Sequence, residues 1–152
     1  MLDMQVYKQA VDMMPKGRSF RVAPGYINVY YNLANLIRAD SSRTLEAYEL
    51  YQKALSMKPD FVEAHMNKGD LLLRMNKSLD AKRSFEKALQ YNPEYTDAHY
   101  NLATALVQLG ERREAERTYK RALALNGGHI FSLLSLGTLL LEEGRLQEAR
   151  KL

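Results

Sequence analysis

Cysteine is absent from this chain of 152 residues. Its absence excludes a disulfide framework, a zinc site built on cysteine thiolates and a cysteine nucleophile. It leaves the compartment open, because proteins of oxidising compartments can also lack cysteine. No apolar run approaches the roughly 18 residues of a membrane-spanning helix, so the sequence predicts no transmembrane segment within the chain.

A strong excess of one charge sign is absent as well. The 22 lysines and arginines stand against 18 aspartates and glutamates. Residues 1–61 carry 8 positive and 6 negative charges, residues 62–95 carry 6 and 5, and residues 96–152 carry 8 and 7. The small surplus of positive charge is therefore spread along the chain. A nucleic-acid-binding protein concentrates its basic residues on one face. Nucleic acid is therefore not a predicted partner.

Similar residues recur every 34 positions along most of the chain. Three such columns are Asn67, Asn101 and Ser135; Ala81, Ala115 and Ala149; and Phe85 and Tyr119. A period of roughly 20 to 50 residues is typical of repeat arrays, in which each unit buries its apolar face against its neighbours. The spacing divides the chain into units at 27–61, 62–95 and 96–129, followed by a truncated unit at 130–152.

Each unit carries the pattern of two helices joined by a short turn. Small residues such as Ala34 and Gly69 mark where the helices cross closely, and a ring such as Phe85 fills the space beside them. Pro59 ends the second helix of its unit, since proline cannot continue a helix. Gly110 suits the left-handed turn between two helices. These features form the tetratricopeptide (TPR) signature, and they predict an all-α, right-handed superhelical solenoid of helix-turn-helix units.

The two ends of the chain resemble parts of further units. Residues 1–14 match the end of a preceding second helix, and 15–26 are predicted to be a linker. The unit at 130–152 stops within its second helix, so we expect part of the apolar face of its first helix to be exposed. The leucines concerned are Leu133, Leu136 and Leu140, and Leu146 of the second helix is expected to be partly exposed as well. Such a face favours either further repeats or end-to-end packing between copies of the chain.

Three rows of residues on the first helices are predicted to face the concave side of the array. They are the asparagines Asn32, Asn67 and Asn101; the tyrosines Tyr31 and Tyr100; and the polar residues Asn35, Asp70 and Thr104. An asparagine amide offers both a donor and an acceptor, so a spaced row can pair with the backbone of an extended polypeptide. The tyrosines add apolar contact with a polar tip. Asparagines in this row can instead bond within their own repeat and stabilise the helix-turn-helix, and the sequence leaves both interpretations open.

A cationic clamp for a C-terminal carboxylate is not predicted. Such a clamp needs lysine or arginine on the first helices, where the charged group can reach a carboxylate. The first helices are expected at 28–37, 63–73 and 97–107, and Lys68 is the one basic residue within these limits.

No site for a metal, a cofactor or catalysis can be assembled from the sequence. His65 and His99 stand 34 residues apart in a position where a large ring normally packs, so we interpret them as packing residues. No nucleophile–base pair, glycine-rich phosphate loop or pair of pocket carboxylates is recognisable. The chain itself is therefore predicted to contain no catalytic residue, metal or cofactor.

One modification motif is present. Asn76-Lys77-Ser78 is an acceptor sequence for N-glycosylation, and the repeat pattern places it in an exposed turn between two helices. Motifs of three residues are frequent by chance. The weight of this one depends on an independent argument for a lumenal location.

That argument comes from a resemblance that is most distinctive over residues 22–88. The segment contains NVYYNLANLI after a linker, then LYQKALSMKPDFVEAHMNKGDLL and the turn MNKSLDAK. In these features it resembles the C-terminal repeats of the transmembrane and tetratricopeptide-repeat-containing (TMTC) family. The resemblance implies a multi-pass protein of the endoplasmic reticulum with lumenal repeats, associated with O-mannosylation of cadherin domains. It also implies catalytic carboxylates outside this chain, and an asparagine row that contacts the acceptor.

Two alternatives stand beside this interpretation. One is a cytosolic TPR scaffold in a protein assembly, and the other is the repeat arm of an O-GlcNAc-type transferase. All three predict a protein or peptide as the partner. They differ in compartment, since the first is lumenal and the others are cytoplasmic.

Overall fold

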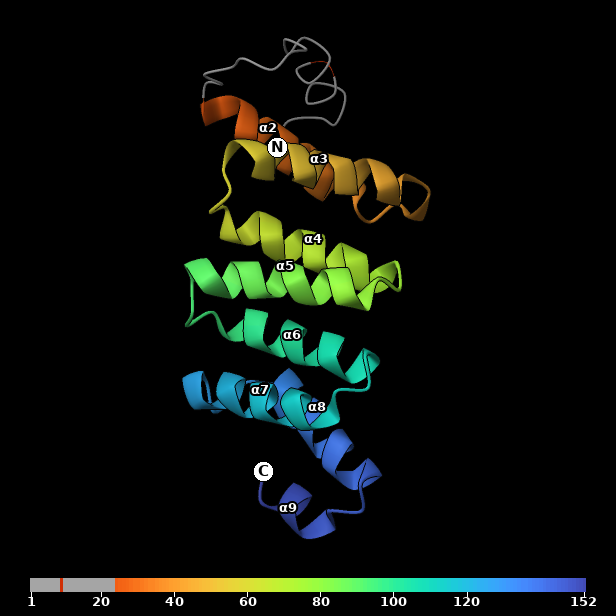
Figure 1. The fold of residues 1–152 in the computed structure, drawn as a ribbon, viewed down its shortest axis with the longest axis vertical. Coiled ribbons are helices and arrows are strands. Elements are labelled where there is room, and N and C mark those ends of the chain that lie inside the picture. The colour runs from red at the N-terminus through yellow and green to blue at the C-terminus, as the bar shows by residue number, and fades with distance from the viewer. Residues whose placement is uncertain (1–8, 10–23) are drawn as a thin grey trace.

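Every described element is helical (Figure 1). The computed structural model describes Gln9 and residues 24–152. In chain order the elements are α2 (Pro24–Ile37), the short 3-10 helix η1 (Ser41–Arg43), α3 (Thr44–Met57), α4 (Val62–Arg74), α5 (Ser78–Tyr91), α6 (Thr96–Gln108), α7 (Arg112–Leu125), α8 (Ile130–Glu142) and α9 (Leu146–Arg150). No strand occurs among the described residues, in agreement with the predicted all-α class.

The helices stack in pairs along one long axis, in chain order (Figure 1). Each helix contacts the helices before and after it, and α4 also contacts α6, the first helix of the next unit. The buried residues fall into three successive clusters instead of one central core. This is the layout of a repeat array, in which each unit is stabilised by its nearest neighbours. The predicted solenoid of helix-turn-helix units is confirmed.

Left-handed turns end the first helices of units two to four. Gly110 and Gly144 have φ angles of 78° and 73°, and Asn76 takes the same position in unit two with φ 61°. In each turn the next backbone N–H bonds back to the carbonyl five residues earlier, as Lys77 does to Leu72 at 2.9 Å. This bond satisfies a carbonyl that the end of a helix otherwise leaves without a partner.

The closest helix crossing lies in unit two. Gly69 of α4 faces the fully buried ring of Phe85 of α5. A Cβ atom at position 69 would lie 2.5 Å from Phe85 Cε1, which is below a normal contact distance. At the equivalent Gly137 of α8 a Cβ atom would meet Leu152 Cδ1 at 3.7 Å, an ordinary contact. Position 69 therefore requires glycine, whereas position 137 does not.

An ion-pair cluster joins unit three to unit four. Arg145, in the turn between α8 and α9, donates to the two carboxylate oxygens of Glu116 of α7 at 2.6 and 3.1 Å. It also pairs with Glu143 and Glu148. Lys120 reaches the Glu116 carboxylate at 2.7 Å. The hydrogen bonds from Arg145 and Lys120 lower the pKa of Glu116 to about 2.

The N-terminal boundary of the first unit differs from the sequence prediction. α2 begins at Pro24, so residues 24–26, which were assigned to the linker at 15–26, are helical. Proline is well suited to the first position of a helix, because the N–H that it lacks has no partner there. Apart from Gln9, the predicted helix end at 1–14 and the rest of the linker lie outside the described residues.

The C-terminal unit exposes a different apolar face from the one predicted. Leu136 and Leu140 are buried, because they pack with Leu106 and Tyr119 in the last core cluster. The prediction that they are exposed was wrong, although Leu133 is half-buried as expected. The large apolar residues that α8 exposes are Ile130, Phe131, Leu134 and Leu141.

We expect Gly69→Ala to lower the free energy of unfolding by about 1–3 kcal/mol, because the added methyl group must displace Phe85 in a close-packed site. Urea and thermal unfolding measure the change. Gly137→Ala is the matched control, and it is expected to leave stability unchanged or to raise it, since alanine favours a helix by about 1 kcal/mol over glycine. Equal effects of the two substitutions would contradict the tight crossing in unit two.

Acid is expected to weaken the junction of units three and four. Glu116 has a pKa of about 2 in the folded chain, whereas an unpaired glutamate titrates near about 4.3. As the pH falls the unfolded chain therefore takes up this proton first, and the stabilisation present above the unfolded pKa is lost by about pH 2. Arg145→Gln should raise the Glu116 pKa toward its ordinary value in a carboxyl carbon NMR titration, and Lys120→Gln should raise it less. An unchanged titration of Glu116 in Arg145→Gln would refute this assignment.

Candidate functional site

The first helices of the four units are α2, α4, α6 and α8, and α4 contacts α6 directly. We call the surface that carries their predicted peptide-binding positions the A-helix wall. The positions predicted to bind a peptide lie on it: Tyr31, Asn32 and Asn35 on α2, Asn67 and Asp70 on α4, and Tyr100, Asn101 and Thr104 on α6. All of these residues are half-buried. They differ in how many of their polar atoms are already bonded within the chain.

Asn67 is fully engaged at the junction of units one and two. Its Nδ2 donates to the Tyr31 hydroxyl at 3.1 Å and to Asn35 Oδ1 at 3.0 Å. Its Oδ1 accepts a hydrogen bond from Arg38 Nη1 at 3.1 Å. Both ends of this amide therefore have partners from the preceding unit, and Asn67 stabilises the array.

A tyrosine of the second helix completes this network. The Tyr51 hydroxyl of α3 donates to Asn35 Oδ1 at 2.6 Å, and its ring is fully buried. Burial raises the pKa of Tyr51 to about 12, so the hydroxyl keeps its proton and remains a donor at neutral pH. Asn32, in the same helix as Asn35, also has a contact within the chain.

The junction of units three and four repeats this arrangement with other residues. The Tyr119 hydroxyl of α7 lies 3.4 Å from Thr104 Oγ1. Burial raises the pKa of Tyr119, and interactions of its hydroxyl with Thr104 and with Ser135, which takes the place of Asn67 in its row, oppose this rise. A buried hydroxyl of the second helix thus again meets the polar rows of two successive first helices.

Tyr100 belongs to a cluster of rings at this junction. Its ring centroid lies 6.0 Å from that of Tyr119, 5.4 Å from that of His129 and 5.9 Å from that of Phe131. The His129 ring is held by Asp97, whose Oδ1 lies 3.0 Å from Nε2. Phe131 is 63% exposed, so this part of the wall presents an aromatic surface to solvent.

The junction of units two and three lacks both tyrosine hydroxyls. Met66 stands in the row of Tyr31 and Tyr100, and Phe85 stands where the neighbouring units have a tyrosine. Neither side chain can bond to Asn101. Within the part of the chain that the structure describes, the Asn101 side chain has no hydrogen-bond partner. Its half-buried amide is therefore available to a ligand.

Asp70, in unit two, lies between Arg38 of unit one and Arg74 of its own helix. Its Oδ2 is 4.0 Å from Arg38 Nη1 and 3.9 Å from Arg74 Nε. The three side chains are between about a third and a half exposed, and ion pairs of this kind add little to stability. This group offers both signs of charge to a ligand.

These two arginines were not predicted from the sequence. The predicted first helices stopped one residue short of each, but α4 includes Arg74, and Arg38 directly follows α2. The expectation that Lys68 is the one basic residue of the first helices was therefore wrong. Lys68 itself donates to Gln52 Oε1 at 2.7 Å, so it is directed to the second helix α3.

A hollow of about 250 Å³ opens on the wall between units three and four. Its lining residues are Val107, Tyr119, Leu134, Ser135, Thr138, Leu139 and Glu142. Leu134, which stands in the row of Tyr100, is 65% exposed. An apolar lining with a few hydroxyl and carboxylate groups is suited to an apolar side chain with a polar neighbour.

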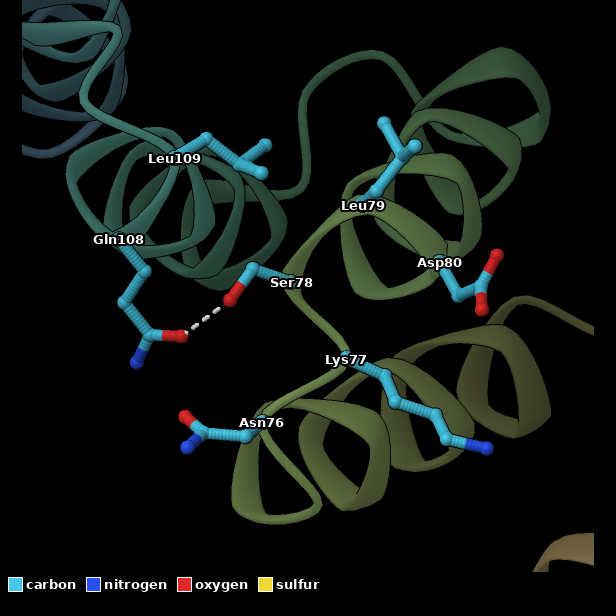
Figure 2. Close-up of a pocket in the computed structure, with 7 residues that line it drawn as sticks. All are labelled: Asn76, Lys77, Ser78, Leu79, Asp80, Gln108 and Leu109. Atoms are coloured by element: carbon cyan, nitrogen blue, oxygen red, sulfur yellow. Dashed lines mark hydrogen bonds between the residues drawn. The ribbon is translucent and has the colours of Figure 1, made fainter.

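The glycosylation motif lies in the turn between α4 and α5. Asn76 is exposed, as predicted from the repeat pattern. Ser78 Oγ donates to Gln108 Oε1 at 2.6 Å, across the junction of units two and three (Figure 2). The last residue of the motif is therefore part of a contact between repeats.

Two further features are absent from the described part of the chain. No group of three or more histidine, aspartate or glutamate side chains there could hold a metal ion. None of its helices is both long and apolar enough to cross a membrane. The Nε2 atoms of His65 and His99 instead lie 2.7 and 2.8 Å from the carbonyl oxygens of Pro59 and Pro93, as expected for packing residues.

Profiles of the tetratricopeptide repeat match three stretches of the chain. The matched residues are 27–61, 62–95 and 79–129. The first two coincide with units drawn from the 34-residue period. The array is thus a protein-interaction module of the tetratricopeptide kind.

About half of the chain is similar to protein O-mannosyl-transferases. It is 51% identical over 76 residues to human Protein O-mannosyl-transferase TMTC3 and equally to the mouse protein. It is 43% identical over 79 residues to Drosophila melanogaster Tmtc3. These matches cover 47–49% of this chain and 8% of each relative, so the chain spans a small part of their length.

Solved tetratricopeptide structures share the fold. MamA has a TM-score of 0.84 at 20% identity, over 97% of this chain and 81% of its own. YrrB, described as a TPR protein with an unusual peptide-binding site, has a TM-score of 0.74 at 27% identity. The match covers 97% of this chain and 71% of YrrB. The first TPR of Spaghetti (RPAP3), bound to the HSP90 peptide SRMEEVD, has a TM-score of 0.75 at 21% identity. The match covers 83% of this chain and 99% of that structure.

The two asparagines of one row should behave differently when truncated. Asn67→Ala is expected to lower the free energy of unfolding by about 1–3 kcal/mol, because it leaves half-buried polar groups without partners. Asn101→Ala is expected to change it by no more than about 0.5 kcal/mol. Urea unfolding of the two variants makes the comparison. A loss at Asn101 as large as that at Asn67 would show that the Asn101 amide is not open.

Proposed function

Because this chain is built of tetratricopeptide repeats and fits the TMTC family over its matched segment, we propose that it is the lumenal, acceptor-binding arm of an endoplasmic-reticulum protein O-mannosyltransferase. The catalytic residues of that enzyme belong to a part of the protein outside these repeats. The observation that carries the proposal is the open amide of Asn101, beside the ring of Tyr100, on the A-helix wall.

Asn101 recognises the main chain of the acceptor. Its amide has an acceptor oxygen and two donor hydrogens, which complement the C=O and N–H groups of an extended polypeptide. The side chain is half-buried, so water competes less with such bonds than it does at a fully exposed site. Because these bonds involve the main chain, they leave the acceptor sequence largely free at this point.

Side-chain preference comes from the adjoining junction. The exposed ring of Phe131 and the hollow beside Leu134 together favour an apolar residue of the acceptor, a few positions from the segment bound by Asn101. At the other side, Asp70 stands between Arg38 and Arg74, so neither charge sign is strongly selected. The wall therefore suits extended segments with spaced apolar residues.

Cadherin domains, the acceptors that the family resemblance implies, contain segments of this kind. They are β-sandwiches, whose strands alternate apolar and polar residues. A strand that is not paired in its sheet offers free backbone N–H and C=O groups to the amide of Asn101. We infer that the arm binds such a strand while it is exposed, and holds the chain for mannosylation at a neighbouring position.

The test is site-specific photo-crosslinking in the full-length protein in living cells. A photoreactive amino acid replaces Leu134 on the A-helix wall, and in the control it replaces Leu45 on the second helix α3. The two leucines are 65% and 61% exposed, so the positions are matched in residue type and exposure. We expect Leu134 to crosslink secretory-pathway polypeptides, cadherins among them, well above the Leu45 background.

Asn101→Ala should reduce the Leu134 crosslinks about fivefold, because a lost hydrogen bond of about 1 kcal/mol weakens binding by that factor. Crosslinks confined to cytosolic proteins would overturn the proposal in favour of a cytosolic scaffold or an O-GlcNAc-type arm. Equal yields from Leu134 and Leu45 would show that the wall has no binding site.

A further inference from the structure

Asn76 occupies a turn position at which the backbone alone favours glycine. Its φ of 61° is left-handed, and the equivalent positions in the next two units are Gly110 and Gly144. A left-handed backbone costs most residues about 1–2 kcal/mol, whereas glycine adopts it freely. Asparagine is among the few other residues that tolerate it. Position 76 thus satisfies the turn with a residue that also presents a side-chain amide.

The Asn76 amide is accessible from solvent. The residue is exposed, and its side chain has no hydrogen-bond partner within residues 24–152. Figure 2 shows Asn76 and Lys77 pointing in opposite directions from the turn. An open hollow of about 610 Å³ adjoins the amide. Leu79, which is 49% exposed, and Leu109 line the same hollow, so apolar surface is available to the faces of a sugar ring.

We propose that Asn76 carries an N-linked oligosaccharide, an inference that rests on the proposed lumenal location. The donor is an oligosaccharide joined to a lipid by a pyrophosphate, and a separate transferase catalyses the step. Nδ2 of Asn76 forms a bond to the anomeric carbon while the bond from that carbon to the phosphate oxygen breaks. The lipid pyrophosphate is the leaving group, and one amide proton passes to a base of the transferase. The step involves no change of oxidation state.

The contact of Ser78 indicates when this transfer takes place. The hydroxyl two residues after the asparagine is part of the acceptor motif. In the folded chain it donates to Gln108 Oε1 of the next unit at 2.6 Å, so it is already occupied (Figure 2). The motif is complete and open only before unit three packs on unit two. The oligosaccharide is therefore added to the chain before this junction folds.

Three substitutions in the full-length protein test the site in cultured animal cells. Asn76→Gly keeps the left-handed turn and removes the amide, whereas Asn76→Gln would strain the turn as well. Ser78→Ala removes the motif and keeps Asn76, and Ser78→Thr keeps both. The readouts are the gel mobility before and after an amidase that releases N-linked glycans, and mass spectrometry of the peptide containing residue 76. Protease protection of the repeats in intact microsomes reports their side of the membrane independently.

We expect the wild type and Ser78→Thr to carry one glycan more than Asn76→Gly and Ser78→Ala, with the repeats protected in microsomes. Protected repeats in which residue 76 is never modified would overturn the glycan and leave the proposed function intact. Repeats digested from the cytosolic side would overturn the lumenal arm and the glycan together. An amidase-sensitive mobility shift as large in Asn76→Gly as in the wild type would show that position 76 carries no glycan and refute the assignment.

Discussion

The rings that α3, α5 and α7 pack against the first helices of their own units are the contacts on which the rest of this array depends. Tyr51, Phe85 and Tyr119 are at most 3% exposed, and they lie in the successive clusters that replace a single core. Tyr51 and Phe85 are the largest of the fully buried side chains, so their rings strongly constrain how the two helices of a pair cross. In unit two the ring comes so close that α4 has glycine at position 69.

The same rings decide which polar groups of the A-helix wall are available. Where the ring is a tyrosine, its buried hydroxyl needs a partner and takes one from the wall, at Asn35 or Thr104. Where the ring is Phe85 this demand is absent, and both Asp70 and Asn101 remain open to solvent. Asn67 and Asn101 are therefore the same type of residue in the same row, but the amide of Asn67 is bonded within the array and that of Asn101 is not.

The sequence was sufficient to predict the structural features that repeat along the chain, but not those that occur in one unit only. The period of 34 residues predicted the helix pairs, the left-handed turns and the exposed motif at Asn76, because each depends on local pattern. The Asn67 network depends on Tyr31 and Arg38, and Arg38 lies just beyond a predicted helix end, where boundaries are uncertain by one or two residues. The burial of Leu136 was missed because it depends on how α8 is rotated against its neighbours.

The stabilising network, the proposed binding amide and the proposed glycan site lie at different places along the array, because its units interact mainly with their nearest neighbours. Asn67 and its partners hold the first junction, Asn101 is open at the second, and the apolar hollow lies at the third. Asn76 lies nine residues after Asn67, roughly 14 Å along the helix axis at about 1.5 Å per residue. The proposed glycan is therefore attached at the end of the helix pair, about two helical turns beyond Asn67 of the asparagine row.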